Sequence, residues 1–248
     1  QSLRQMAAKS RRPVDDPEAR DIRKRLAAGD PGGAADLSRK WIAATPNRAL
    51  AHVLLGMSLA RSGDLRGALL SLERSVALDD SLAEARYNYG VAAWFTGDRA
   101  RGGAEVDESV KLNPLSAEAY AFRGMTLRES GDLDGARRML QYAIAVDPMM
   151  VASYFDLAVV FLRSNQMPWA LGQFEAGLNV PKASGPPPDF GAAITELSKT
   201  AGSNADAHHM LGRLMGLAGA SAPQVLAEFT ESLRLNPMYV EAHNSIGL

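Results

Sequence analysis

Cysteine is missing from this 248-residue chain, which excludes disulfide scaffolds, thiolate metal sites and cysteine nucleophiles. An excess of charge is missing too, since 27 Lys and Arg stand against 28 Asp and Glu for a net charge of −1. This balance excludes a strongly basic nucleic-acid binder or an acidic tail protein as a description of the whole chain. No apolar run approaches the roughly 18 residues that cross a bilayer, so we expect no direct membrane insertion.

What the chain does have is a folding composition, with 46% hydrophobic and 22% charged residues. Its length allows one or two domains with a sizeable core. The compartment stays open between the cytoplasm and a periplasmic or exported location. The chain begins with Gln1, so a signal peptide would not be visible.

Glycine and proline recur in this sequence with a period of 34 residues. The first series, in which each glycine precedes an aspartate, comprises Gly29, Gly63, Gly97 and Gly131. The second series comprises Gly56, Gly90 and Gly124. The third series consists of prolines, with Asp80 in the missing place, and comprises Pro46, Pro114 and Pro148. Three independent series with a common period indicate an internal repeat.

Windows cut at this period share small residues at positions 8 and 20 and mostly apolar residues at positions 11 and 24. The windows are 15–48, 49–82, 83–116, 117–150 and about 151–184. This pattern resembles the tetratricopeptide repeat, a 34-residue helix–turn–helix unit. The resemblance covers most of the chain and is strong in 49–150. It is poor at the start of 15–48, where Asp21 and Ile22 stand at the Leu-Gly positions.

Each window also predicts a helical hairpin from its residues alone. Apolar stripes at helical spacing flank the Gly-Asp pair; the glycine supplies a positive-φ helix end and the aspartate follows in the turn. Proline at position 32 ends the second helix. Because one hairpin cannot bury both of its faces, the hairpins must stack. The predicted fold is therefore all-α, a superhelical solenoid of about six to seven antiparallel helix pairs, with no strand longer than four residues.

Small residues at position 8 predict that the two helices of a hairpin approach closely. We expect Gly90 and Gly124 to lie at such contacts. Replacing either by Leu would overpack the hairpin at a cost of about 1–3 kcal/mol.

The windows divide the chain into four parts. Residues 1–14 form a basic lead-in, and 15–184 hold five repeats, the first of them degenerate. Residues 185–204 combine a proline-rich loop with a single helix at about 189–201, and 205–248 hold a further repeat and the start of another. We interpret the single helix as a second helix whose first helix is replaced by the loop. Because a solenoid ends on a polar cap, we expect the chain to continue.

The lead-in at 1–14 carries Arg4, Lys9, Arg11 and Arg12 and no acidic residue. One interpretation is a basic arm that contacts an anionic surface. The other is a lead-in to the first repeat that is frayed or docked on a partner.

No catalytic or metal motif is recognisable in the sequence. There is no phosphate-binding glycine loop and no Gly-x-Ser-x-Gly motif. His52, His208 and His243 all fall at position 4, which favours a periodic structural role. The adjacent His208 and His209 lack the i, i+4 spacing of a helical ligand pair. We therefore expect no enzyme activity, no cofactor and no metal.

Function in such a solenoid is expected on the face that the first helices form, and the resemblance implies that positions 2, 5, 9, 12 and 13 point there. This chain is apolar and aromatic at these positions. It lacks the Lys and Asn with which the family's chaperone-binding members hold a C-terminal carboxylate. The predicted partner-binding residues are Met57, Tyr87, Val91, Trp94, Phe95, Met125, Phe155 and Val159.

Tyr87, Val91, Trp94 and Phe95 share one helical face through their i, i+4, i+7, i+8 spacing. Truncating Trp94 to Ala is expected to cost about 2 kcal/mol or more of binding and to leave folding intact if the ring is exposed. The alternative is that these aromatic residues pack between repeats or are covered by the N-terminal segment.

The sequence thus predicts a non-catalytic scaffold or assembly subunit. Its partner would be a protein that offers an amphipathic helix or an extended apolar segment, and not nucleic acid. Two alternatives stay open. The chain could be the repeat part of a larger enzyme, such as a glycosyltransferase that resembles this architecture, with catalysis beyond Leu248. It could also be a self-associating array protein.

Overall fold

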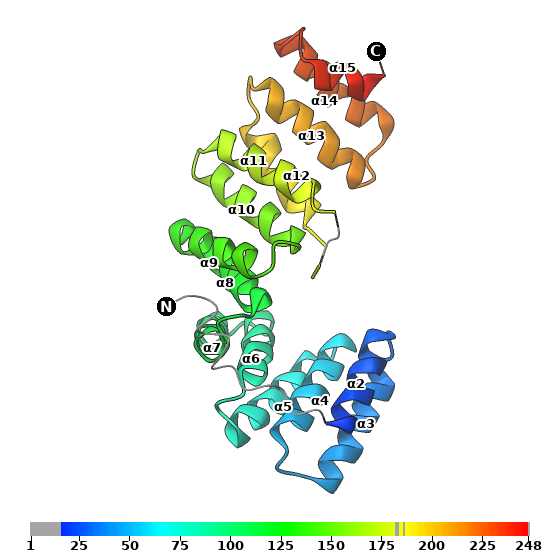
Figure 1. The fold of residues 1–248 in the computed structure, drawn as a ribbon, viewed down its shortest axis with the longest axis vertical. Helices are drawn as coiled ribbons and strands as arrows, with labels where there is room; N and C mark the ends of the chain where they lie inside the picture. Colours follow the sequence, from blue (N-terminus) through cyan, green and yellow to red (C-terminus); the bar gives the residue numbers. More distant parts are fainter. Residues whose placement is uncertain (1–15, 182–183, 186, 248) are drawn as a thin grey trace. The chain divides into compact units, whose positions relative to one another are not determined.

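The predicted all-α fold is confirmed by a computed structural model, which describes residues 16–181, 184–185 and 187–247 (Figure 1). These ranges contain fourteen α-helices. Strand-like pairing within them is limited to one isolated bridge between Met150 and Ser184.

The helices alternate between the two members of successive hairpins. The first helices are α2 (Pro17–Ala27), α4 (Ala49–Arg61), α6 (Ala83–Phe95), α8 (Ala117–Ser130), α10 (Val151–Arg163), α13 (Ala205–Leu217) and α15 (Val240–Ile246). The second helices are α3 (Pro31–Ala44), α5 (Leu65–Leu78), α7 (Arg99–Leu112), α9 (Leu133–Val146), α11 (Met167–Leu178) and α14 (Ala222–Leu235). The single helix expected at about 189–201 is α12 (Phe190–Thr200), and it packs against α10 and α13.

The Gly-Asp pairs form the turns within the hairpins, and each residue has its own task. The glycines have left-handed backbones, with φ from 74° at Gly29 to 104° at Gly97, and in the fifth hairpin Asn165 takes the same conformation. Each aspartate begins the second helix as its N-cap, as when Asp64 Oδ1 accepts the Gly67 N–H at 2.8 Å. The sequence pattern predicted an aspartate in the turn but not this capping role.

A buried serine ties the end of the second helix to the start of the first in three hairpins. Ser75 donates to the Ala49 carbonyl at 2.8 Å, Ser109 to that of Ala83 at 2.9 Å, and Ser232 to that of Ala205 at 2.9 Å. These bonds join residues 26 or 27 positions apart, so they hold tertiary structure and not merely a helix.

We expect Ser75→Ala to lower the free energy of unfolding by about 1 kcal/mol, because a buried hydrogen bond between two helices is lost. Ser71→Ala is the matched control, since the Ser71 hydroxyl bonds only to the Gly67 carbonyl of its own helix. Urea titrations of both variants measure the difference. Equal losses at the two sites would contradict the assigned role of Ser75.

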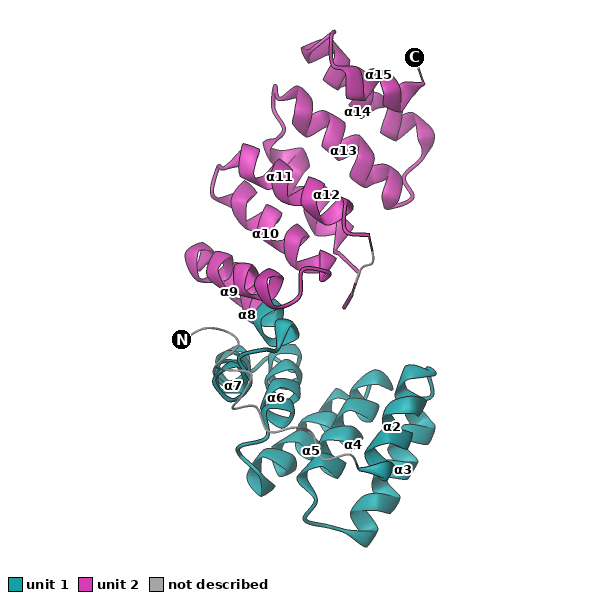
Figure 2. Ribbon diagram, in the orientation of Figure 1, with its two compact units in different colours: residues 1–122 teal, residues 123–248 magenta. Residues whose placement is uncertain are grey.

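The described residues form two compact units, 1–122 and 123–248, with the boundary inside α8 (Figure 2). In unit 1, one buried cluster centres on Ile22 and Leu54 and another on Leu72 and Tyr89. In unit 2, a larger cluster runs through α9 to α13 and includes Phe155.

Candidate partner-binding face

Four aromatic side chains gather on the first helices of unit 1. The ring of Phe122, from α8, lies 6.2 Å from that of Tyr87, 6.4 Å from that of Trp94 and 6.2 Å from that of Phe95, all three from α6. The Tyr87 and Trp94 contacts are edge-to-face, the arrangement that aromatic pairs favour. Tyr87, Trp94 and Phe95 therefore contact the next repeat through Phe122, which is the packing between repeats that the alternative predicted.

Phe122 is not among the predicted contact residues. It stands at position 6 of its window, outside the positions that the family resemblance assigns to this face. A signal was available in the repeat pattern. Phe122 stands two residues before Gly124, and the equivalent positions of the two preceding repeats hold Leu54 and Asn88. Nothing in the sequence, however, said which neighbouring helix such a ring would meet.

The α6 residues of the cluster differ in how far they reach solvent. Trp94 is 8% exposed and has the Arg99 guanidinium 5.1 Å from its ring centre, a cation–π contact. Burial, helped by the charge of Glu118, raises the pKa of Tyr87 to about 12, so the phenol stays neutral. Phe95 is 60% exposed.

The condition under which Trp94 could be truncated without affecting folding, an exposed ring, is therefore not met. Its indole is enclosed by Phe122 and Arg99, so Trp94→Ala would remove packing as well as any contact with a partner. Phe95 is the residue of this cluster that a partner can reach directly.

Phe95 takes a position that another repeat uses for a polar contact. In the second hairpin of unit 1, position 13 holds Arg61, whose guanidinium donates to the Leu26 carbonyl at the end of α2 at 2.8 Å. A cation there offsets the negative end of the helix dipole. Phe95 cannot do this, and an exposed apolar ring stands at that position instead.

An ion pair marks the polar edge of the same face. Arg23 of α2 donates two hydrogen bonds to the Glu84 carboxylate of α6, at 2.9 and 2.7 Å. The helices α2 and α6 both contact α4, which carries the half-buried Met57. Val91, on α6, is half-buried as well. The face thus combines partly exposed apolar groups with one bidentate charge pair.

Besides Trp94, two of the eight predicted contact residues belong to the core. Phe155 is 2% exposed and Val159 1% exposed. The rings of Phe174 and Phe190 each lie 5.3 Å from that of Phe155, and Phe190 comes from α12. Arg163 at the end of α10 also pairs with Glu196 of α12 at 3.1 Å. Because α12 covers this side of α10, the two residues are corrected to core positions. The remaining residue, Met125, is half-buried on α8.

The position-4 histidines have the periodic role that the sequence predicted. Nε2 of His52 lies 2.9 Å from the Pro46 carbonyl, and His208 and His243 make the same contact with the carbonyls of Gly202 and Pro237. Each contact spans six residues and braces the turn ahead of a first helix. Among the described residues, no group of three His, Asp or Glu side chains is arranged to hold a metal ion.

The adjacent His208 and His209 should have opposite effects on stability as the pH changes. Burial, together with Arg213, lowers the pKa of His209, which lies against Phe229 and Tyr239. Burial alone would also lower the pKa of His208, but its bond to the Glu228 carboxylate and its contact with the Gly202 carbonyl raise it.

His209 therefore contributes stability above the unfolded pKa of about 6.5 that is lost as the pH falls through its folded pKa. His208 contributes stability at low pH that is lost as the pH rises through its folded pKa. Unfolding free energies at pH 5.5 and 7.5 test this pair. Relative to the parent, stability should fall less on acidification in His209→Gln and more in His208→Gln. The reverse order would contradict the assignment.

In the part of the chain that the structure describes, no helix is both long and apolar enough to span a membrane. The four basic residues Arg4, Lys9, Arg11 and Arg12 lie outside the described residues, so the two interpretations of the lead-in stay predictions.

The repeated hairpins, their capped turns and the bracing contacts define a helical-repeat protein. The family model for the tetratricopeptide repeat matches residues 53–117 and 123–186, together just over half of the chain. This protein therefore belongs to the tetratricopeptide repeat family, as the sequence pattern predicted.

Comparisons with individual proteins agree with this fold. Photosystem I assembly protein Ycf3 of Acaryochloris marina is 34% identical over 66 residues, a stretch that covers 27% of this chain and 40% of that protein. The chain thus matches less than half of that relative's length. The crystal structure of MamA aligns with 62% of this chain and 91% of the MamA chain, with a TM-score of 0.56. The sequence identity is 25%.

Two further structures are similar in fold alone. The structure of Pseudomonas aeruginosa PilF aligns with 94% of this chain and 96% of the PilF chain, with a TM-score of 0.62. The sequence identity is 14%. YrrB, described as a tetratricopeptide repeat protein with an unusual peptide-binding site, is 16% identical, with 86% of this chain and all of its own aligned and a TM-score of 0.54.

Proposed function

We propose that this chain is a non-catalytic scaffold or assembly subunit that binds a segment of a partner protein on the first-helix face of unit 1. The proposed contact residues are Met57, Tyr87, Val91, Trp94, Phe95 and Phe122. The observation that supports this most is Phe95, which is 60% exposed and yet held against Phe122. A large ring that is ordered before binding gives up little conformational entropy on binding.

The chemistry of the face suggests the kind of segment it takes. Aromatic and Met side chains suit apolar anchors of an amphipathic helix or an extended strand. The Arg23–Glu84 pair at the edge would favour a segment with polar residues beside its anchors, because covering charged groups with apolar ones removes them from water at a cost. The names of two similar proteins fit this proposal, since Ycf3 is called an assembly protein and YrrB is described with a peptide-binding site.

The proposal is tested by comparing what three forms of the chain capture from a native extract. The forms are the parent, Phe95→Glu and Trp169→Glu. Trp169 is the matched control, because it is 65% exposed but lies on the second helix α11 in unit 2. We expect a protein that the parent and Trp169→Glu retain and that Phe95→Glu loses. Identical capture by all three forms would contradict the proposed face.

A further inference from the structure

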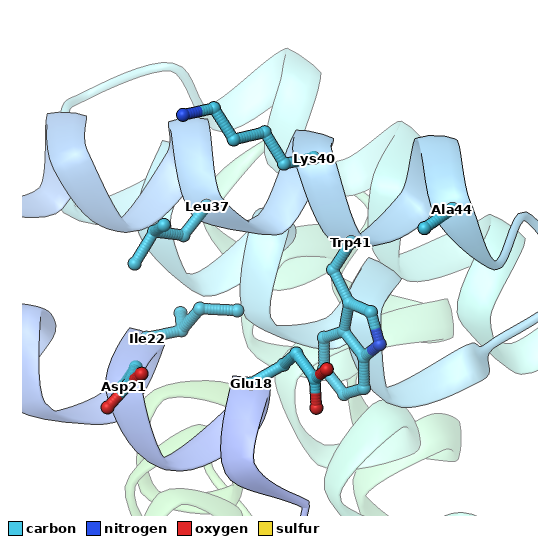
Figure 3. Close-up of a pocket in the computed structure, with 7 residues that line it drawn as sticks. All are labelled: Glu18, Asp21, Ile22, Leu37, Lys40, Trp41 and Ala44. Carbon is cyan, nitrogen blue, oxygen red and sulfur yellow. The ribbon is translucent and has the colours of Figure 1, made fainter.

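A pocket of about 260 Å³ opens between α2 and α3 in the first hairpin (Figure 3). Its apolar wall is formed by Ile22, Leu37 and Trp41, and its rim carries the charged groups of Glu18, Asp21 and Lys40. Trp41 is 7% exposed, since its other side packs on the cluster that contains Leu54.

The sequence explains why space is left between α2 and α3 in this hairpin. Ile22 stands at position 8, where the following repeats hold Gly56, Gly90 and Gly124. A Cβ at those glycines would come within 2.5 to 2.7 Å of the facing second helix. The whole side chain of Ile22 must therefore hold α2 and α3 further apart, which leaves space between them.

The pocket also lies on a side that is covered in a later repeat. The first helices α4 and α6 each follow a second helix that packs on them, α3 on α4 and α5 on α6. Tyr89, at the same position as Asp21, is 2% exposed beneath such packing, whereas Asp21 is exposed. Among the described residues, no second helix precedes α2.

We propose that residues 1–12 of this chain fill the pocket, in the place that a preceding second helix would take. The spacing of the chain supports this occupant. Four residues, 45–48, connect α3 to α4, and four, 79–82, connect α5 to α6. Residues 13–16 provide the same length between residue 12 and α2, and they include Pro13 as 45–48 include Pro46.

The chemistry of residues 1–12 matches the pocket as well. In helical spacing, Leu3, Met6 and Ala7 would share one face, which suits the apolar wall. The charges are complementary, because the segment carries only basic residues and the α2 side of the rim carries two carboxylates.

Disulfide formation in the full chain tests this proposal without interference, because the protein has no cysteine. The test variants pair Leu3→Cys or Met6→Cys with Lys40→Cys at the rim. The matched control pairs the same positions with Arg74→Cys, since Arg74 is exposed and lies one repeat further along at the same position as Lys40. Copper phenanthroline serves as the oxidant, and intact mass with non-reducing electrophoresis reports the product.

We expect an intramolecular disulfide to Cys at position 40 to form at least about tenfold faster than the control disulfide, because docking raises the local thiol concentration. Glu18→Lys combined with Asp21→Lys should slow the reaction about fivefold or more, since like charges then face each other. Asp36→Lys, on α3 outside the pocket lining, should leave the rate unchanged.

Three results would overturn the proposal. Equal rates for the position-40 and position-74 pairs would show that the segment does not dock in the pocket. A disulfide between two chains in place of one within a chain would assign the pocket to a second copy. A rate that is unaffected by reversing both carboxylates would remove the charge complementarity on which the choice of occupant depends.

Discussion

Gly90→Ala is expected to lower the free energy of unfolding by about 1–3 kcal/mol, the range of an overpacked contact. A Cβ on Gly90 would lie 2.7 Å from Val106 Cγ2 and 2.8 Å from the Gly102 carbonyl oxygen. The backbone oxygen cannot move aside without separating α6 from α7. The close approach that the sequence predicted at this glycine is thus confirmed, and even a methyl group is too large for it.

Gly172→Ala is the matched control, because it makes the same change inside a helix where nothing lies within 4 Å of the new Cβ. It is expected to raise the free energy of unfolding by about 0.5–1 kcal/mol, since alanine is a better helix former than glycine. Chemical denaturation of both variants measures the two changes. Opposite signs support the packing account, whereas a stabilising effect at both sites would contradict it.

Phe155→Ala is expected to cost more, about 3–5 kcal/mol, because a large buried ring is replaced by a cavity. The ring lies between Phe174 and Phe190 at 5.3 Å from each, so the change would loosen α10 from both α11 and α12.

The control for Phe155 is Phe95→Ala, which removes a ring of the same size from a side chain that is 60% exposed. We expect it to cost less than about 1 kcal/mol, as for substitutions near the surface. Equal losses at the two positions would show that Phe155 is not the core residue assigned here.

The features that the sequence predicted correctly are those that depend on local geometry. Gly63 and its equivalents end helices because a left-handed backbone is needed there. The shared position of His52 and His208 indicated a common structural role, and each contacts a carbonyl six residues earlier. Such features recur with the repeat, so one period is enough to recognise them.

The features that it missed depend on which helix covers which face. The sequence placed Phe155 on the partner face by its position in the repeat, but α12 lies outside the 34-residue period and covers it. Phe122 contacts Tyr87 and Trp94 across a hairpin boundary. Such contacts follow from packing between hairpins, and periodicity carries no information about them.

Paired measurements on the captured protein test whether the face around Phe95 binds a partner. Binding affinity and melting temperature are measured for the parent, Phe95→Ala and the exposed control Trp169→Ala. We expect Phe95→Ala to weaken binding about 30-fold, the scale of a 2 kcal/mol hot spot, and to leave the melting temperature within a few degrees of the parent. Trp169→Ala should change neither quantity. Parent-like affinity in Phe95→Ala would contradict binding at this face.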